Sequence, residues 1–145
     1  MSNNKLDIYT DGACLGNPGP GGWAALIIEN NQEKIFSGNH EMTTNNRMEL
    51  LAVIKALESI NHLLEITIHT DSKYVIDGIT SWINNWKVND WKGSNKTPVK
   101  NIDLWKRLDR SVQKNKIKWI WVKGHSGNIY NEKVDEIARN QAKTL

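Results

Sequence analysis

Four carboxylates in the sequence stand where expected strands end or expected helices begin. Asp11 and Asp71 close the strands expected over residues 6–11 and 66–71. Glu49 and Asp135 lie in the first turns of the helices expected to start at residues 46 and 131. In an open α/β sheet, sites form beyond the carboxyl ends of the strands. If the first and fourth strands are neighbours, Asp11 and Asp71 therefore come close together.

Carboxylates that are brought together repel one another, and a bound divalent cation offsets that repulsion. Sites built only from oxygen ligands select Mg²⁺ or Mn²⁺ over zinc. Two such ions about 4 Å apart stabilise the attacking and leaving oxygens of an in-line phosphoryl displacement. The spacing leaves a simpler interpretation open. Glu49 and Asp135 could offset helix dipoles, and Asp11 and Asp71 could be turn formers.

Hydrophobic periodicity and turn residues predict the elements that must position these side chains. Strands are expected over residues 6–11, 23–29, 34–38, 66–71 and 117–123, and helices over residues 46–60, 72–79, 80–86, 101–115 and 131–142. Thr44 or Asn45 can cap the first helix, a break is expected near Gly78, and residues 88–98 form an irregular projection. Strands joined by turns pair antiparallel, whereas strands that follow helices run parallel. The predicted fold class is α/β, a five-stranded mixed sheet (three antiparallel strands, then two parallel) with helices on both faces.

The bulk composition indicates one globular domain over residues 1–145, with 39% hydrophobic and 24% charged residues. Cys14 is the lone cysteine, so an internal disulfide cannot form and a reducing compartment is expected. No apolar run approaches the roughly 20 residues needed to cross a bilayer. The polar N-terminus, residues 1–5, has no secretory signal core. We therefore expect a cytoplasmic protein that does not enter membranes.

Basic charge is concentrated in residues 73–118, where 11 Lys and Arg accompany four Asp, although the net charge of the whole chain is only +3. A basic stretch attracts polyanions. Trp82, Trp86 and Trp91 lie inside it, near Lys87. Aromatic side chains interleaved with lysines suit the binding of a nucleic-acid strand, because the rings stack on bases or sugars and the lysines meet phosphates. The alternative is that Trp82 and Trp86, four residues apart, belong to a helical core stripe.

Five motifs follow one another along essentially the whole chain. They are TDGACLGNPGPGGW at residues 10–23, TTNNRMEL at 43–50, TDSKYV at 70–75, WVKGHSG at 121–127 and NEKVDE at 131–136. In this order and spacing they resemble the bacterial type 1 ribonuclease H enzymes. The resemblance implies the ribonuclease H-like fold and a Mg²⁺-dependent endonuclease that cuts the RNA strand of an RNA–DNA hybrid.

By this resemblance, Asp11, Glu49, Asp71 and Asp135 are the metal-binding carboxylates for two Mg²⁺ ions, for which Mn²⁺ can substitute. Asp11 is expected to bridge both ions, Glu49 and Asp71 to hold the ion that activates water, and Asp135 to hold the other. Cleavage then leaves a 5′-phosphate and a 3′-hydroxyl. His125, the loop histidine of the family, is expected to assist proton movement or product release.

The resemblance also implies a set of substrate-binding residues in four places: the glycine-rich turn, the start of the helix at residue 46, the position that follows Asp71 and Ser72, and a basic protrusion over residues 82–101 called the handle. They are Cys14, Gly16, Asn17, Thr44, Asn45, Asn46, Lys73, Trp82, Lys87 and Trp91. Cys14, Gly16 and Asn17 are expected against the nucleic-acid backbone, and Asn45 and Asn46 in the minor groove, where they can read the 2′-hydroxyl of RNA. The handle is expected to hold chiefly the DNA strand.

The chain departs from the family pattern at two points. Lys73 stands where relatives often carry Gln or Asn, and it could reach a phosphate instead. Residues 87–91 carry one Lys and one Asp where relatives often have a denser cationic run. We therefore expect weaker and more salt-sensitive binding with activity retained. Arg47 is expected to support local structure and is left out of the site.

Two other functions were weighed against the hybrid-specific ribonuclease. A two-metal nuclease of the same fold that acts on DNA is disfavoured by the complete motif set, especially residues 44–49. A non-catalytic hybrid-binding module is disfavoured because all four carboxylates and His125 are present, and clustered acids without metal repel phosphates. We expect a monomer with no obligate protein partner.

Overall fold

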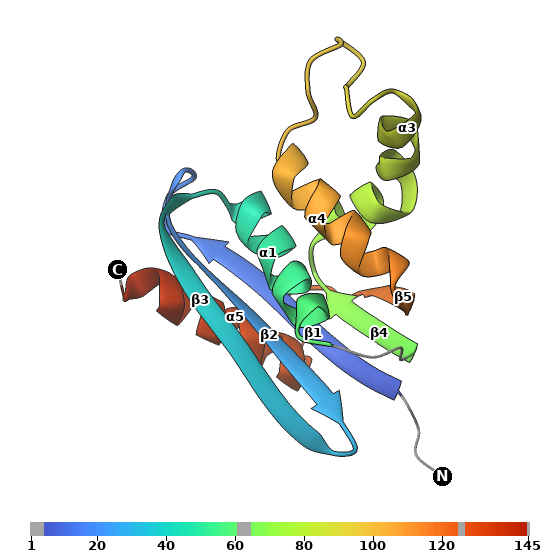
Figure 1. Cartoon of the computed structure of the whole chain (residues 1–145). Coiled ribbons are helices and arrows are strands. Elements are labelled where there is room, and N and C mark those ends of the chain that lie inside the picture. The colour runs from blue at the N-terminus through green and yellow to red at the C-terminus, as the bar shows by residue number, and fades with distance from the viewer. Residues whose placement is uncertain (1–4, 61–64, 125–126, 145) are drawn as a thin grey trace.

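The structure is a computed structural model that describes residues 5–60, 65–124 and 127–144. One five-stranded sheet has the strand order β3-β2-β1-β4-β5 (Figure 1). The strands are β1 (Lys5–Cys14), β2 (Gly19–Glu29), β3 (Gln32–Thr43), β4 (Glu65–Thr70) and β5 (Lys116–Trp121). The first three strands pair antiparallel, whereas β4 and β5 run parallel to β1. The predicted fold class is confirmed, and β1 and β4 are neighbours.

The first three strands are longer than the sequence pattern predicts. β1 continues past Asp11 because its residues 12–14 pair with residues 21–23 of β2, so part of the glycine-rich run belongs to a strand. At the other end of β2, Asn30 and Asn31 form the hairpin turn, with φ angles of 52° and 65°. Positive φ at both central residues matches the twist of a two-residue hairpin. The predicted turn is therefore confirmed.

Helices cover both faces of the sheet, as predicted. α1 (Asn45–Glu58) packs on one face with α4 (Ile102–Gln113) beside it, and α5 (Ile129–Lys143) crosses the other face (Figure 1). Thr44 is the N-cap of α1, and its hydroxyl accepts a hydrogen bond from the backbone N–H of Arg47 at 3.3 Å. The larger apolar core lies on the α1 side, and a smaller one lies under α5. Burial of these two faces holds the carboxyl end of β1 between α1 and α5.

The predicted helix break near Gly78 is wrong. α2 (Lys73–Asp77) continues through a π-helical turn, η1 (Gly78–Trp82), into α3 (Ile83–Val88). Gly78 itself has helical backbone angles, φ −63° and ψ −50°. A Cβ on Gly78 would collide with the ring of Trp105. The glycine therefore allows this helical segment to approach α4 closely instead of ending the helix.

The predicted irregular projection is confirmed. Between α3 and α4 the chain forms a long loop that extends beyond the rest of the molecule (Figure 1). Backbone hydrogen bonds close it, from Val99 N–H to the carbonyl of Trp91 at 3.0 Å and from Gly93 N–H to that of Thr97 at 2.8 Å. These bonds give the loop that follows α3, residues 89–101 of the handle, a defined shape without a further helix or strand.

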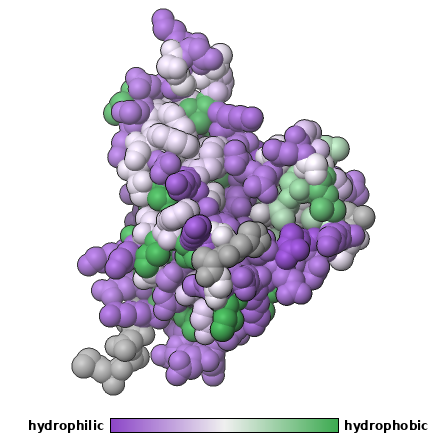
Figure 2. Space-filling model, turned by 180° about the vertical axis from the view of Figure 1, so that it is seen from behind, coloured by the Kyte–Doolittle hydropathy of each residue, from purple (hydrophilic) through white to green (hydrophobic). Residues whose placement is uncertain are grey.

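The surface is mostly polar on the face shown in Figure 2, where hydrophobic residues form small separate patches among hydrophilic ones. Isolated exposed hydrophobic residues are normal on a globular protein. Among the helices that the structure describes, none is long and apolar enough to span a membrane.

Candidate active site

Asp11, Glu49 and Asp71 converge at the centre of the sheet. Each offers one carboxylate oxygen, and the three oxygens lie within 4.8 Å of one another. Asp11 and Asp71 directly follow Thr10 and Thr70, the last pair of the parallel β1–β4 ladder. The neighbouring strands thus deliver two carboxylates to one point, as the sequence predicted, and α1 delivers the third.

The first-turn placement predicted for Glu49 and Asp135 is wrong. α1 begins at Asn45 and α5 at Ile129, so both carboxylates lie beyond the first turn of about 3.6 residues. The first turn of α1 contains no acidic residue, and that of α5 contains Glu132 instead. The charge–dipole effect fades beyond the first turn. Compensation of the helix dipole therefore does not explain Glu49 or Asp135.

Gly12 allows α1 to approach β1. A Cβ at this position would lie 2.5 Å from the backbone nitrogen of Glu49 and 2.5 Å from the carbonyl carbon of Met48. Any larger residue would force the helix away from the strand. The Gly12 N–H also donates to Oδ1 of Asp11 at 2.9 Å. The same glycine thus orients one carboxylate and admits the helix that carries another.

Burial gives these acids unusual protonation behaviour. Asp11 and Glu49 are 3% and 5% exposed. Burial raises the pKa of Asp11 to about 8, and the neighbouring charge of Asp71 adds to the rise. Burial also raises the pKa of Glu49 well above its ordinary value, followed by the charges of Asp11 and Asp71. Ionised acids in such a place need a compensating positive charge.

The donor set fits a hard divalent cation. Oε2 of Glu49 is buried and has no hydrogen-bond partner among the described residues. An orphaned carboxylate oxygen beside two further carboxylates offers the all-oxygen environment that Mg²⁺ or Mn²⁺ prefers. Asp135 faces the same open hollow as Asp11, Glu49 and Asp71 but lies outside the three-oxygen cluster. Its Oδ2 pairs with Nε of Arg139 at 3.1 Å.

The predicted substrate-binding turn lies against the start of α1. Oδ1 of Asn17 accepts a hydrogen bond from the backbone N–H of Asn45 at 3.0 Å. The thiol of Cys14 lies 3.4 Å from the carbonyls of Gly19 and Thr43, and burial raises its pKa. The side chain of Thr44 is engaged in capping α1. Asn45, Asn46 and Lys73 line the hollow that contains the carboxylates, whereas Gly16 lies in the exposed bend between β1 and β2.

Trp121 is a site neighbour that the sequence analysis did not assign. Its indole N–H donates to the backbone carbonyl of Asp71 at 3.2 Å. Nζ of Lys73 lies 4.7 Å from the centre of its ring, a cation–π distance. Trp121 pairs with Thr70 in the β4–β5 ladder, so it ends its strand beside the strand that precedes Asp71. A signal for this was available, because the strand expected over residues 117–123 ends near the same sheet edge.

The handle residues divide between the surface and the core. Trp82 is 38% exposed, whereas Trp86 and Trp91 are partly buried against the main core. The core interpretation thus holds for Trp86 but less for Trp82. Nζ of Lys87 pairs with Oδ1 of Asp109 at 2.8 Å. Three further handle lysines have exposed side chains, namely Lys92, Lys96 and Lys100. The predicted His125 lies outside the described residues.

A mixed sheet of this strand order, with three carboxylates gathered at its centre, defines an α/β protein of the ribonuclease H-like fold. The RNase H family model matches residues 3–143. A ribonuclease H of Ehrlichia ruminantium (strain Gardel) is 56% identical over 138 residues, which cover 95% of this chain and 94% of that protein. The chain belongs to the ribonuclease H family, whose members hydrolyse RNA, and the predicted resemblance is confirmed.

Two solved structures place the fold within the family. LC9-RNase H1, described as a type 1 RNase H with the type 2 active-site motif, superposes with a TM-score of 0.89 at 30% identity, covering 99% of this chain and 74% of that one. LC11-RNase H1, solved in complex with an RNA/DNA hybrid, superposes with a TM-score of 0.72 at 20% identity, covering 96% and 97%. The first agrees with the predicted type 1 resemblance, and the second supports the fold.

Proposed function

We propose that the chain is an endonuclease that hydrolyses the RNA strand of RNA–DNA hybrids with two divalent metal ions. The observation that carries the proposal is the cluster of Asp11, Glu49 and Asp71 in a ribonuclease H-like fold, with Oε2 of Glu49 lacking a hydrogen-bond partner in the part of the chain that the structure describes. The hybrid bound by the structurally similar LC11-RNase H1 supports the choice of substrate.

In this proposal Asp11, Glu49, Asp71 and Asp135 hold two Mg²⁺ ions, and Mn²⁺ substitutes for them. When bound, such ions supply a more acidic water and stabilise charge on the leaving oxygen. Asp11 would help to hold both ions. Glu49 and Asp71 serve the side of the attacking water, and Asp135 serves the other side. Their negative charges also set where a phosphate can approach.

The reaction is hydrolysis of one phosphodiester bond. The oxygen of water forms a bond to phosphorus, and the bond from phosphorus to the 3′-oxygen breaks. The 3′-oxygen gains a proton, which leaves a 3′-hydroxyl on one product and a 5′-phosphate on the other. We assign His125 to proton movement or product release, because an imidazole titrates near neutral pH.

Substrate selection is assigned to the residues around the hollow. The turn with Cys14, Gly16 and Asn17 approaches the nucleic-acid backbone, Asn45 and Asn46 face the minor groove, and Thr44 binds substrate beside them at the start of α1. Asparagine side chains can exchange hydrogen bonds with a 2′-hydroxyl, which distinguishes RNA from DNA. Lys73 meets a phosphate as a point charge. On the handle, Trp82, Lys87 and Trp91 contribute to holding the DNA strand.

We further propose that residues 1–145 form one catalytic domain that works as a monomer in the cytoplasm, without an obligate protein partner. The handle, residues 82–101, is part of that domain and not a separate unit. Size-exclusion chromatography with light scattering would test the monomer.

The first experiment compares end-labelled RNA–DNA, RNA–RNA and DNA–DNA duplexes, each with Mg²⁺ and with EDTA. We expect cleavage of only the RNA in the hybrid, and its loss in EDTA. Cleavage of the DNA duplex would identify a DNA-directed nuclease of the same fold. Binding of the hybrid without cleavage in either Mg²⁺ or Mn²⁺ would identify a binding module. Either result would overturn the proposed function.

A further inference from the structure

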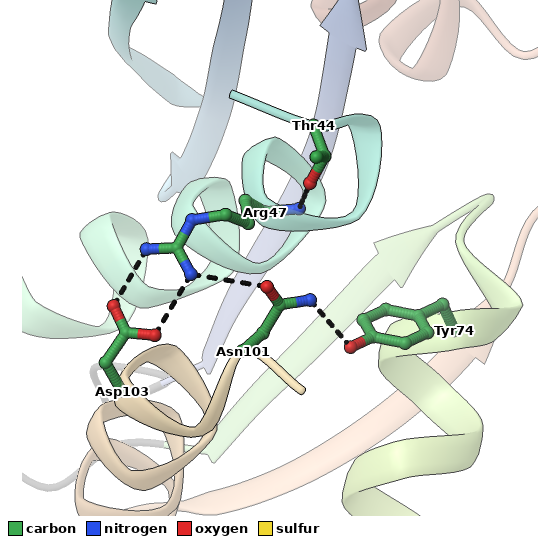
Figure 3. Close-up of polar contacts among 5 residues, drawn as sticks. All are labelled: Thr44, Arg47, Tyr74, Asn101 and Asp103. Atoms are coloured by element: carbon green, nitrogen blue, oxygen red, sulfur yellow. Dashed lines mark hydrogen bonds and ion pairs between the residues drawn. The ribbon is translucent and has the colours of Figure 1, made fainter. Parts of the chain in front are cut away.

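Arg47 links α1 to α4 directly and, through Asn101, to α2 (Figure 3). Its guanidinium, on α1, forms a bidentate ion pair with Asp103 on α4, with nitrogen–oxygen distances of 3.0 and 2.8 Å. One of these nitrogens also donates to Oδ1 of Asn101 at 3.3 Å. Nδ2 of Asn101 in turn donates to the hydroxyl of Tyr74 on α2 at 3.0 Å. A continuous polar chain therefore joins α1, the start of α4, and α2.

Both ends of the handle meet this polar chain. The handle returns to the body at Asn101, directly before α4, and it leaves from the helical segment that begins with α2. The hydroxyl of Tyr74 also accepts a hydrogen bond from the indole N–H of Trp105 at 3.0 Å. The ring of Tyr74 packs edge-on against Trp82, with centroids 5.8 Å apart. The helix that enters the handle is thereby fastened to the helix that leaves it.

The backbone of Asn101 makes the handle sensitive to this contact. Asn101 is in the left-handed region, with φ 61° and ψ 29°, and it is the N-cap residue of α4 without a side-chain capping bond. Its side chain is held instead by Arg47 and Tyr74. Asparagine tolerates this backbone conformation better than most residues. The direction in which the chain leaves the handle thus depends on a residue whose side chain Arg47 orients.

On α1, Arg47 lies between the residues assigned to substrate and those assigned to metal. Asn46 directly precedes it, and Glu49 follows two residues later in the same helix. Its backbone N–H is bound by the capping hydroxyl of Thr44. A shift of Arg47 relative to α4 would therefore change the distance between the handle and the carboxylates.

A second ion pair shows that Arg47 is not needed merely to join the two helices. At the other end of the same pair of helices, Arg107 of α4 makes a bidentate contact with Glu58 of α1, both distances being 2.6 Å. The side chains of Arg47 and Arg107 are similarly exposed, at 34% and 33%. Among the described residues, the side chain of Arg107 forms no hydrogen bond or ion pair with the handle. It is a matched control, because its loss removes an equivalent link between α1 and α4.

We propose that Arg47 is a positioning residue for substrate, which fixes the handle at a set distance and direction from the carboxylates. A duplex held on the handle then presents its scissile phosphate to Asp11, Glu49 and Asp71. This inference rests on the proposed function, because it requires a hybrid that contacts both the handle and the carboxylates.

The test measures hybrid binding by fluorescence anisotropy in the Asp11→Asn background, and kcat and KM in the active enzyme. We expect Arg47→Ala to weaken binding and raise KM about tenfold, as small misplacements of bound groups do. Arg107→Ala should change the affinity for the hybrid and KM less than about twofold. It should nevertheless lower the unfolding temperature about as much as Arg47→Ala does. Arg47→Lys should restore only part of the affinity, because lysine keeps the charge but cannot bind bidentately.

A double-mutant cycle with exposed handle lysines separates positioning from general stability. If Arg47 acts through the handle, the combined substitution of Lys92 and Lys96 by Ala weakens hybrid binding in the parent protein. In the Arg47→Ala background the same combined substitution causes little further loss of affinity. We also expect the cut positions on a single defined hybrid to spread in Arg47→Ala. Arg107→Ala should leave the cut positions unchanged.

Three results would overturn the inference while leaving the proposed function in place. In the first, Arg47→Ala binds the hybrid as tightly as the parent protein. In the second, Arg107→Ala loses as much affinity as Arg47→Ala. In the third, the fold-losses of affinity from Arg47→Ala and from the handle lysine substitutions simply multiply when they are combined. A parent protein that neither binds nor cleaves the hybrid would overturn the proposed function itself, and the inference with it. The two failures are therefore distinguishable in one set of measurements.

Discussion

The carboxylate of Asp11 on β1 lies within 4.8 Å of the carboxylate of Glu49 on α1, and both side chains are almost completely buried. The approach of α1 to β1 at Gly12 makes this proximity possible. Two negative charges in such a place are strongly unfavourable unless they are neutralised. The metal-free protein therefore retains protons in the cluster, and cation binding must release them.

Removal of the Asp11 charge should abolish catalysis without unfolding the protein. We expect Asp11→Asn to lower the rate of hybrid cleavage by at least about a thousandfold, because the cluster loses one of its charged metal ligands. The circular dichroism spectrum should be unchanged. Asp90→Asn, on the exposed handle, is the charge-matched control and should stay active. Retained Mg²⁺-dependent turnover in Asp11→Asn would contradict the metal assignment.

The stability of the metal-free protein should fall as pH rises from about 4 to about 8. The pKa of Asp11 is raised in the folded state from 3.8 to about 8, so over this range the folded state binds more protons than the unfolded state. The free energy of unfolding then decreases with pH, by at most about 1.4 kcal/mol per pH unit for one group. Denaturant unfolding at several pH values in EDTA measures this slope.

Two controls make that pH dependence specific. Saturating Mg²⁺ should flatten the fall, because the ion binds the deprotonated carboxylates of the folded state. Asp11→Asn should flatten it as well, and should be the more stable protein at pH 8 in EDTA. A parent protein in EDTA whose stability rises steadily from pH 4 to pH 8 would show that the cluster does not hold extra protons.

Replacement of Lys73 should weaken hybrid binding and its salt dependence. Lys73 lies in the hollow beside the carboxylates, with its ammonium group against the ring of Trp121. We expect Lys73→Gln to raise Kd a few-fold and to reduce the slope of log K against log salt concentration by about 0.9, the loss of one phosphate contact. Lys34→Gln, on β3 near the distant hairpin, should change neither. An unchanged slope in Lys73→Gln would remove Lys73 from the substrate site.

Gly12→Ala should damage both stability and the site. The added Cβ would press on the backbone of Met48 and Glu49 at 2.5 Å, and backbone cannot move aside cheaply. We expect a loss of about 1–3 kcal/mol in the free energy of unfolding, as for other overpacked positions. Mg²⁺ affinity, measured by calorimetry, should fall because Glu49 moves away from Asp11. Gly93→Ala, where no neighbour comes closer than 3.6 Å, is the control. Equal stability of both variants would show that β1 and α1 tolerate separation.

The sheet could be predicted from local patterns because its strands and turns have strong local signals. Asn30 and Asn31 marked the hairpin, and Thr44 was one of two expected caps. Strand bounds were less predictable, since β1 continues past Asp11 only because β2 is there to pair with it. Gly78 was expected to break a helix, but its lack of a side chain serves a contact with Trp105, distant in sequence. Such features depend on partners that no local pattern reveals.

The sequence by itself determined which residues could do the chemistry, because the local pattern that predicts a strand also predicts that Asp11 and Asp71 come after its apolar residues. It also supplied the family motifs. Only the tertiary structure decided which groups meet, since the β1–β4 pairing brings those carboxylates together and Gly12 admits Glu49. In the same way it joined Arg47 to Asp103. Long-range contacts depend on the packing of whole elements, and that packing decides the distances on which catalysis depends.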